Sequence, residues 1–358
     1  MVRSPGQCRT LQVLRAFLPD SPCTLSGRDI VRIGTPVPTI CLSHSSAREL
    51  WGLLRKGSLS AMPSCAIDEV PDPCRLQRHV LDHLSQAEAI VGSLSRPLHV
   101  CSHSREALMR GKDVRGHLLS DETTDGQILR LGEGLYVTSP ELTLAQLSLT
   151  LSPLQRAAYA MQLMGAYSLD PDGHLSAVQP ITTQAQLRHF YSQLRWPLVK
   201  GHMRRAVELA REGSRSPAET ELYLLLCAPP RQGGYGLTKP ELNIPFSLPT
   251  QWDALLNTPY ILPDLCWPCK KLAMEYDSKR YHSLEQERDR DDDRRCALEE
   301  LGFTVISLRT KRFMDPHRFD ELVRHRVAPR LGVKPPPSDH EFWNAIYAAR
   351  RELLSPAS

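Results

Sequence analysis

The sequence predicts a mixed α/β protein, in which a C-terminal mixed sheet flanked by helices follows a smaller mixed α/β domain. The chain has 358 residues, about twice the usual size of one domain. Short runs typical of strands alternate with runs of helical periodicity along it. With 41% hydrophobic and 23% charged residues, the composition is that of an ordinary globular protein, which excludes wholesale disorder, collagen and fibrous repeats.

The charge and cysteine content limit the compartment and the partners. Forty-four basic and 40 acidic residues leave a net charge of +4, too small to coat nucleic acid non-specifically, so any basic surface must be local. The first residues do not read as a secretory signal and no run of about 18 apolar residues occurs, so we expect a cytoplasmic protein without membrane contact. Ten scattered cysteines favour free thiols, and the close pair Cys266 and Cys269 lacks the second ligand pair that zinc needs.

The N-terminal half reads as one α/β domain followed by a helical connector. Residues 1–40 are short apolar pieces to which we assign no role. In the predicted domain, residues 41–175, we expect a helix capped by Ser43, strands at 98–101 and 135–138, and an apolar helical stretch at 142–164. The predicted connector, residues 176–213, holds two helices, 184–194 and 199–212.

The C-terminal unit, residues 214–335, has the clearest local signals. Ser216, Pro217 and Glu219 form a helix start with a cap, a proline at the first position and an acid at the third. After it we expect a hairpin of strands 261–267 and 271–277, a charged helix at 284–301 and a buried strand at 303–308. The tail, residues 336–358, carries a last helix at 339–354 that either packs back or floats.

Acidic residues gather in the predicted hairpin. Alternate side chains of a strand share one face, so Glu275, Asp277 and Lys279 project together, and Asp264 on the opposite strand can face Glu275. Hard divalent ions such as Mg²⁺ or Mn²⁺ take carboxylate ligands in this arrangement and can activate water. A solvated strand face with unrelated acids is the alternative, and spacing alone does not choose between them.

A family resemblance favours the metal site. The C-terminal unit contains, in this order, the motifs Ser216-Pro-Ala-Glu219, Pro263-Asp264, Glu275-Tyr-Asp277 with His282, Arg288-Asp-Arg and Leu298 through Ile306. Their order resembles that of the very-short-patch-repair-like (Vsr-like) endonucleases of the PD-(D/E)xK, or restriction-endonuclease-like, superfamily. The resemblance covers residues 214–330. It implies a restriction-endonuclease-like mixed sheet, with metal-binding carboxylates at Asp264 and Glu275, an acid of the first helix at Glu219 and a catalytic histidine at His282.

The sequence departs from the superfamily pattern at one position. The lysine expected two residues after Glu275 is Asp277, a form usual in the Vsr-like branch, and Asp277 becomes a third candidate catalytic and metal-binding acid. Lys279 has the same strand parity and is the candidate for the missing positive charge, although a lysine at a strand end is commonly just solvated. Glu219 has an alternative role in a capping box, and His282 alone would be a weak signal.

Basic residues in two places are candidates for DNA contact. The charged helix carries several arginines, among them Arg288, which either form a solvated face or meet phosphates near the site. From Leu301 to Arg330 there are seven Lys or Arg and three Asp or Glu, an excess of four that equals the net charge of the whole chain. We therefore expect Arg309, Lys311 and Arg312 to contact the DNA backbone.

Two segments of the front half resemble AbiEi-type antitoxin and regulator proteins, which makes 41–175 an AbiEi-like domain. They are Ile40 through Gly52 and Gly134 through Leu147. Within them we interpret His44 and Ser139 as capping and packing residues. The winged-helix DNA reader that usually precedes these segments is not evident in residues 1–40.

The sequence thus predicts a bacterial cytoplasmic enzyme, a Mg²⁺- or Mn²⁺-dependent DNA endonuclease that hydrolyses phosphodiester bonds. Its expected partner is DNA, with no small-molecule cofactor and no protein partner identified. The alternative is a non-catalytic DNA-binding regulator or antitoxin that retains the nuclease fold. A protein-interaction module draws support only from the proline-rich loops.

Overall fold

The computed structural model describes residues 39–57, 65–67, 85–106, 108, 111–119, 126–169, 175–277 and 285–354. These residues form a mixed α/β structure with several sheets, as predicted. Contacts divide the chain into two compact units. The first holds the described residues up to 50 and those from 65 to 139, and the second holds 51–57 and those from 140 to 354. The segment boundaries predicted from the sequence stay predictions.

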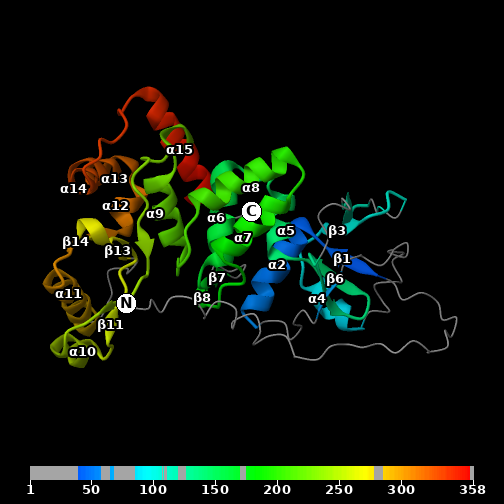
Figure 1. The fold of residues 1–358 in the computed structure, drawn as a ribbon, viewed down its shortest axis with the longest axis horizontal. Coiled ribbons are helices and arrows are strands. Elements are labelled where there is room, and N and C mark those ends of the chain that lie inside the picture. The colour runs from blue at the N-terminus through cyan, green and yellow to red at the C-terminus, as the bar shows by residue number, and fades with distance from the viewer. Residues whose placement is uncertain are drawn as a thin grey trace, which may run out of the picture. The chain divides into compact units, whose positions relative to one another are not determined.

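The first unit is built on a six-stranded mixed sheet, with strand order β2-β5-β6-β1-β3-β4. Figure 1 labels three of its strands, β1, β3 and β6. Its elements are β1 (Ile40–Leu42), the start of α2 (His44–Arg55), β2 (Cys65–Ile67), α4 (Ser85–Gly92), β3 (Leu98–Ser102), β4 (Val114–Leu118), β5 (Ile128–Gly132) and β6 (Leu135–Thr138). β1 is wholly buried, pairing parallel with β6 and antiparallel with β3. The predicted helix after Ser43 and the strands near 98 and 135 are confirmed.

The second unit begins with helices, and one prediction there was wrong. The stretch 142–164, expected as one helix, is two: α5 (Pro140–Leu147) and α6 (Pro153–Met164). Ser152 separates them, because its side chain accepts from the backbone of Gln155 in a reciprocal capping box and Pro153 occupies the first helical position. A short ribbon and two helices near their predicted positions follow: β7 (Tyr167–Leu169), β8 (Leu175–Ala177), α7 (Gln184–Gln193) and α8 (Pro197–Leu209).

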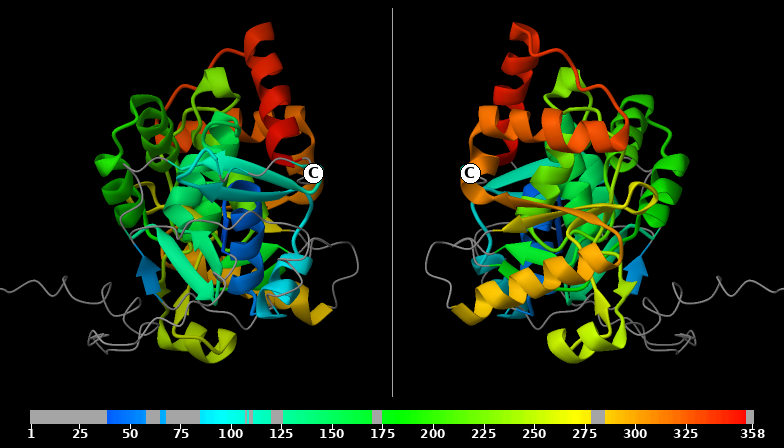
Figure 2. Two further views of the ribbon diagram at one scale, coloured as in Figure 1. Left: turned by 90° about the vertical axis from the view of Figure 1, so that its right-hand side faces the viewer. Right: turned by 90° about the vertical axis from the view of Figure 1, so that its left-hand side faces the viewer.

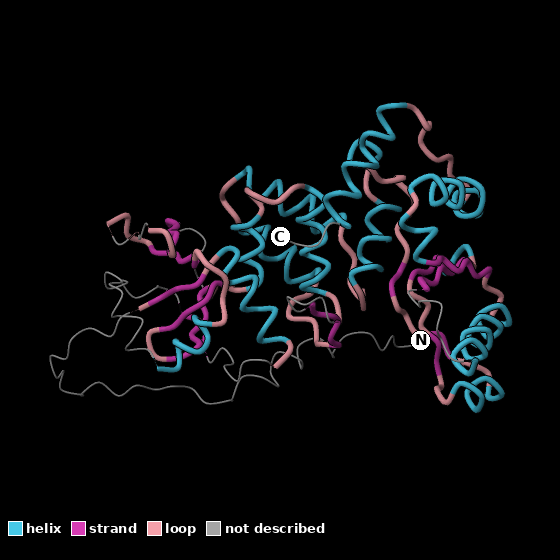
Figure 3. The backbone as a smooth tube through the Cα atoms, turned by 180° about the vertical axis from the view of Figure 1, so that it is seen from behind, coloured by secondary structure: helices cyan, strands magenta, loops and turns pink. Residues whose placement is uncertain are grey.

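The four-stranded sheet of this unit has the order β14-β13-β12-β9. Its surroundings in chain order are α9 (Pro217–Cys227), the turn η2 (Pro230–Gln232), β9 (Glu241–Leu242), β10 (Phe246–Ser247), α10 (Thr250–Leu256), β11 (Tyr260–Ile261), β12 (Leu265–Trp267), the turn η3 (Pro268–Lys270), β13 (Leu272–Asp277), α11 (Glu285–Glu300) and β14 (Thr304–Arg309). The predicted hairpin and the helical crossover to a parallel strand are confirmed. Helices predominate in the second unit, as the cyan tube of Figure 3 shows.

The first strand of the hairpin is shorter than predicted. Ile261 pairs with Phe246 in a separate two-stranded ribbon, and β12 starts only at Leu265. Pro263 lies between the two pieces and has no N–H to donate to a ladder, so the pairing cannot continue through it. The break leaves Asp264 directly before β12, at the open end of the hairpin.

The C-terminal helices complete this unit. They are α12 (Thr310–Met314), α13 (Pro316–Leu322), the π-helical segment η4 (Val323–Val327), α14 (Ala328–Leu331) and α15 (His340–Leu354). Both views of Figure 2 show α15, in red, beside the orange helices that precede it. α15 packs back onto the unit, since it contacts α6, α9 and η2 and buries Phe342 and Ile346. Gly233 allows this approach, because a Cβ at that position would overlap the carbonyl of Ala345.

Candidate active site

Asp264 and Glu275 lie opposite each other at the open end of the hairpin. In the β12–β13 register Leu265 pairs with Met274, so Asp264 and Glu275 are the next opposed positions. The backbone N–H of Tyr276 donates to Oδ2 of Asp264 at 2.7 Å, which fixes this carboxylate over the strand end. The predicted juxtaposition of the two acids is therefore present.

The sheet face that carries these acids is mostly buried. Cys266 and Ala273, one pair further into the hairpin, belong to a core cluster with Ala297 and Leu298 of α11. Strand alternation places Glu275 on the same face, toward α11. Burial raises the pKa of both acids to about 7; the charge of Glu219 adds to the effect at Asp264, and at Glu275 the guanidinium of Arg294 opposes it.

Glu219 is the third acid of this site. It is buried in the first turn of α9, and its charge raises the pKa of Asp264. Its carboxylate accepts hydrogen bonds from the backbone N–H of Arg215 (2.8 Å), from Ser216 Oγ (3.0 Å) and from Asn243 Nδ2 (2.7 Å). Ser216 Oγ also accepts from the backbone N–H of Glu219, so Ser216 caps α9. The hydrogen bond from Asn243 is an additional contact of the Glu219 side chain, outside the cap. We call Glu219, Asp264 and Glu275 the acid cluster.

Arg294 and Asn243 are site residues that the sequence analysis did not single out. Arg294 Nη2 lies 3.3 Å from Glu275 Oε1 and 3.2 Å from the carbonyl of Leu262, so α11 brings a cation to the hairpin end. Asn243 follows β9 and holds Glu219 through its amide, while its backbone N–H donates to the carbonyl of Pro263 at 3.1 Å. The proximity of α11 could have been inferred from the crossover, whereas Asn243 carried no signal in its local sequence.

Asp277 and the predicted basic residues lie at the neighbouring strand end. β13 and β14 pair in parallel, with Asp277 opposite Arg309, and Arg309 Nε lies 3.9 Å from Asp277 Oδ2. The side chain of Arg309 is 84% exposed, and Lys311 and Arg312 of α12 are exposed as well. The basic residues are therefore accessible and start beside the acidic strand.

Three predicted site residues lie outside what the structure describes. Lys279 and His282 fall in residues 278–284, and the side chain of Arg288 in α11 is likewise outside the described part. Their roles stay predictions.

The fit of a metal ion depends on the acid cluster. Within the described ranges, no three His, Cys, Asp or Glu side chains are placed to hold a metal ion together. Mg²⁺ commonly takes only one or two carboxylates and keeps several waters, so two protein ligands suffice for it. Asp264 and Glu275, opposed and with their pKa raised by burial, are a pair that a divalent cation would stabilise in the ionised form.

A second cluster of titratable side chains lies in the first unit. It consists of His44, His99 and His117, and we call it the imidazole cluster. The rings of His44 and His117 stack with centroids 3.7 Å apart, and His117 Nε2 lies 2.9 Å from His99 Nδ1. Burial is the main cause that lowers the pKa of His44 to about 3 and that of His117 to about 4. The interpretation of His44 as a packing residue agrees with this stacking, and Ser139 is buried with its Oγ 2.5 Å from Gln127 Oε1.

Comparison with protein-family models, with curated proteins and with solved structures finds no match to this chain. In the part of the chain that the structure describes, every helix is too short or too polar to cross a membrane.

Proposed function

We propose that this protein is a metal-dependent DNA endonuclease of the PD-(D/E)xK type, acting in the bacterial cytoplasm. The observation that carries the proposal is the opposition of Asp264 and Glu275 at the hairpin end, with Glu219 close enough to raise the pKa of Asp264. Buried acids that repel one another cost stability unless a ligand compensates, and perturbed carboxylates in such clusters are typical of functional sites.

Each acid has a distinct part in the proposed site. Asp264 and Glu275 would hold the ion, with Asp277 as the next acid along the strand. A bound Mg²⁺ or Mn²⁺ would supply an activated water and neutralise charge on the phosphate. Burial raises the pKa of Glu219, and its three hydrogen bonds oppose that rise; when ionised, Glu219 would favour cation binding beside Asp264.

The basic groups around the acids fit a phosphodiester substrate. Arg294 lies against Glu275, and the exposed Arg309 begins the basic segment at the end of β14. Cations at this edge can hold the phosphates on either side of the bond to be cut. The predicted roles of His282 and Lys279 in proton transfer and charge neutralisation stay part of the proposal.

One observation favours the second candidate function, a DNA-binding regulator that does not cut. Arg309, Lys311 and Arg312 are exposed, and they need no metal ion to contact a DNA backbone. In that case the basic segment would bind DNA, and the acid cluster would be a structural feature of the sheet.

The deciding experiment is cleavage of plasmid, mismatched duplex and single-stranded DNA by the purified full chain with Mg²⁺ or Mn²⁺. Asp264→Asn keeps the shape of the side chain and removes the charge, so cleavage should be lost while DNA binding without metal stays equal or tightens. Asp292→Asn, at an exposed position of α11, is the matched control and should cut at the wild-type rate. If the wild-type protein cuts none of these substrates with either ion, the regulator takes the place of the nuclease.

A further inference from the structure

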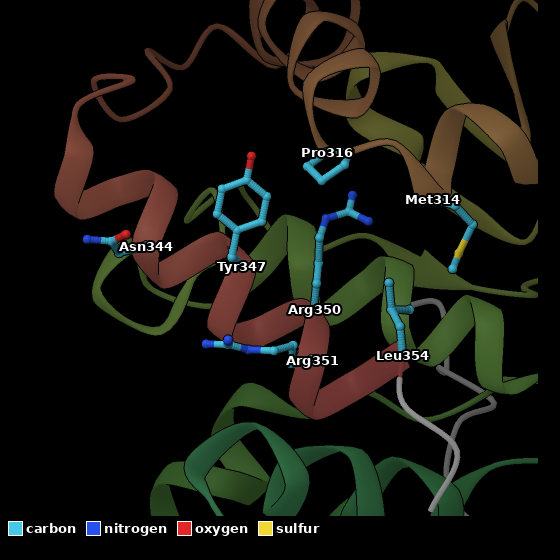
Figure 4. Close-up of a pocket in the computed structure, with 7 residues that line it drawn as sticks. All are labelled: Met314, Pro316, Asn344, Tyr347, Arg350, Arg351 and Leu354. Carbon is cyan, nitrogen blue, oxygen red and sulfur yellow. The ribbon is translucent and has the colours of Figure 1, made fainter.

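A hollow between α15 and the connection from α12 to α13 lies apart from the acid cluster and has no role in the proposed reaction. Figure 4 shows Arg350 and Tyr347 rising from α15 into this hollow, with Pro316 above them and Met314 and Leu354 beside. Asn344 and Arg351 complete the lining. All of these residues belong to the second unit.

Arg350 is buried without a full set of partners. The residue is only 6% exposed, and its Nη1 donates to the carbonyl of Phe313 at 2.8 Å. Nε and Nη2 are buried and have no hydrogen-bond partner among the described residues. A buried guanidinium ordinarily has its N–H groups satisfied, because an unpaired buried donor on a charged group is costly.

Two acids of the adjoining segment, Asp315 at the cap of α13 and Asp320 within it, are engaged elsewhere. Asp315 caps α13 by accepting from the backbone of His317 and Arg318. Asp320 accepts two hydrogen bonds from Arg324 and one from Tyr235. The guanidinium of Arg350 instead makes cation–π contacts, with its central carbon 5.5 Å from the ring centroid of Phe313 and 5.2 Å from that of Phe319.

The neighbouring groups favour an anion with several acceptor oxygens. Arg351 adds a second positive charge, and Asn344 adds an amide. The hydroxyl of Tyr347 lies 3.2 Å from His317 Nε2, and this hydroxyl can turn toward a ligand. A guanidinium presents paired donors that match phosphate oxygens, and two arginines suit a doubly charged phosphate better than a single carboxylate.

We propose that this hollow binds a phosphate group, held by the guanidinium of Arg350 and shared with Arg351. The same chemistry is offered by free phosphate and by the phosphates of a nucleic acid. Lys311 and Arg312 are exposed on α12, the helix that ends at Met314, so a strand bound along the predicted basic segment could place a phosphate here.

The test uses the full chain and inorganic phosphate as the probe. Millimolar phosphate should raise the melting temperature of the wild-type protein above that in chloride of equal ionic strength, and calorimetric titration should give a dissociation constant. Arg350→Gln should weaken this binding by roughly tenfold or more, because the positive charge and its charge-assisted hydrogen bonding are lost. Arg330→Gln, an exposed arginine of α14, should bind phosphate like the wild type.

Arg351→Gln, at an exposed position of the lining, provides a second variant if Arg350→Gln fails to fold. It should weaken phosphate binding by a smaller factor at unchanged melting temperature in chloride. A single-stranded oligonucleotide distinguishes the sources: competition between it and phosphate, lost in the same variants, assigns the hollow to nucleic acid, and binding of phosphate without competition assigns it to a free phosphate compound.

Phosphate binding that is absent in the wild type, or equal in wild type and both variants, would overturn the proposal. None of these measurements needs DNA cleavage. The phosphate site and the endonuclease can therefore fail separately.

Discussion

The acid cluster and the imidazole cluster show how burial acts on groups of opposite charge type. Each gathers three titratable side chains within one unit, and in each burial favours the neutral form. The pKa of Asp264 and Glu275 rises to about 7, and the pKa of His117 falls to about 4. The physical cause is the same. The two clusters differ in whether hydrogen bonds among their own members can satisfy them.

Neutral imidazoles can satisfy one another, whereas ionised carboxylates cannot. A neutral ring has one donor and one acceptor nitrogen, so His99 and His117 hydrogen-bond at 2.9 Å, and the ring of His44 stacks on His117. Ionised carboxylates offer only acceptors, so the acid cluster needs donors or cations from outside, such as Asn243 and Arg294. A divalent ion therefore benefits the acid cluster and gives the imidazole cluster nothing that it lacks.

The largest effect expected from this difference is on catalysis. Glu275→Gln should lower the rate of metal-dependent cleavage by roughly 100-fold or more, because the amide is a poor ligand for a hard cation. His117→Gln, in the other unit, should leave the rate close to that of the wild type. Single-turnover cleavage of a labelled duplex measures both. A loss of cleavage in His117→Gln as large as in Glu275→Gln would mean that the imidazole cluster belongs to the active centre.

The second prediction concerns the sign of the pH dependence of stability without metal. Between about pH 4 and 7 the unfolded acids are ionised while folded Asp264 and Glu275 retain protons, so their contribution to the free energy of unfolding falls as pH rises. Between about pH 4 and 6.5 unfolded histidine is protonated while folded His117 is neutral, so its contribution rises with pH. The two clusters therefore drive stability in opposite directions over the same range.

Urea denaturation across this range separates the two contributions. The difference between the wild type and Asp264→Asn should change by a few kcal/mol in favour of the variant as pH increases. The difference between the wild type and His117→Gln should change in the opposite direction. Mg²⁺ should reduce the first difference and leave the second unchanged, and parallel curves for all three proteins would show that neither cluster has a shifted pKa.

The third prediction separates capping from support of the acid cluster. Ser216→Ala and Thr183→Ala each remove a helix cap, of α9 and α7 respectively, and each should cost about 1 kcal/mol of stability. Only Ser216→Ala also removes a hydrogen bond to Glu219, at 3.0 Å. Cleavage at a temperature where both variants are folded should therefore decrease in Ser216→Ala alone, and equal activity of the two would reduce Ser216 to a cap.

Much of the C-terminal sheet could be predicted because its signals are local. The cap at Ser216, the turn at Pro268 and the glycine at the end of α11 each mark an element boundary within a few residues of sequence. Strand alternation then placed Glu275 opposite Asp264 without any knowledge of the rest of the fold. The same local reasoning failed at residue 152, where the apolar pattern continues across a helix break, and at Pro263, which interrupts the predicted strand.

The partners of the acids could not be predicted, because they depend on contacts distant in sequence. Asn243 lies 24 residues from Glu219, and Arg294 lies 19 residues from Glu275. The charged helix α11 shows several arginines of similar local pattern, and only the packing of that helix on the sheet selects Arg294. Arg350 illustrates the same limit, since a helix position that reads as polar is 6% exposed in the fold.

The smallest predicted effect concerns the exposed basic segment beside the acid cluster. Arg309→Gln and Lys311→Gln should each reduce the slope of log binding constant against log salt by about 1, because each variant neutralises one DNA phosphate fewer. Arg309 is the more informative position, because its side chain is 84% exposed and lies 3.9 Å from Asp277, at the strand end that the proposed active site shares. Each variant is made together with Asp264→Asn, which removes cleavage, and its binding to duplex DNA at several salt concentrations gives the slope. Arg330→Gln, at an exposed position, is the control. If the slope is the same in all of these proteins, the segment after β14 does not bind the DNA backbone, and the acid cluster must receive its substrate from another side.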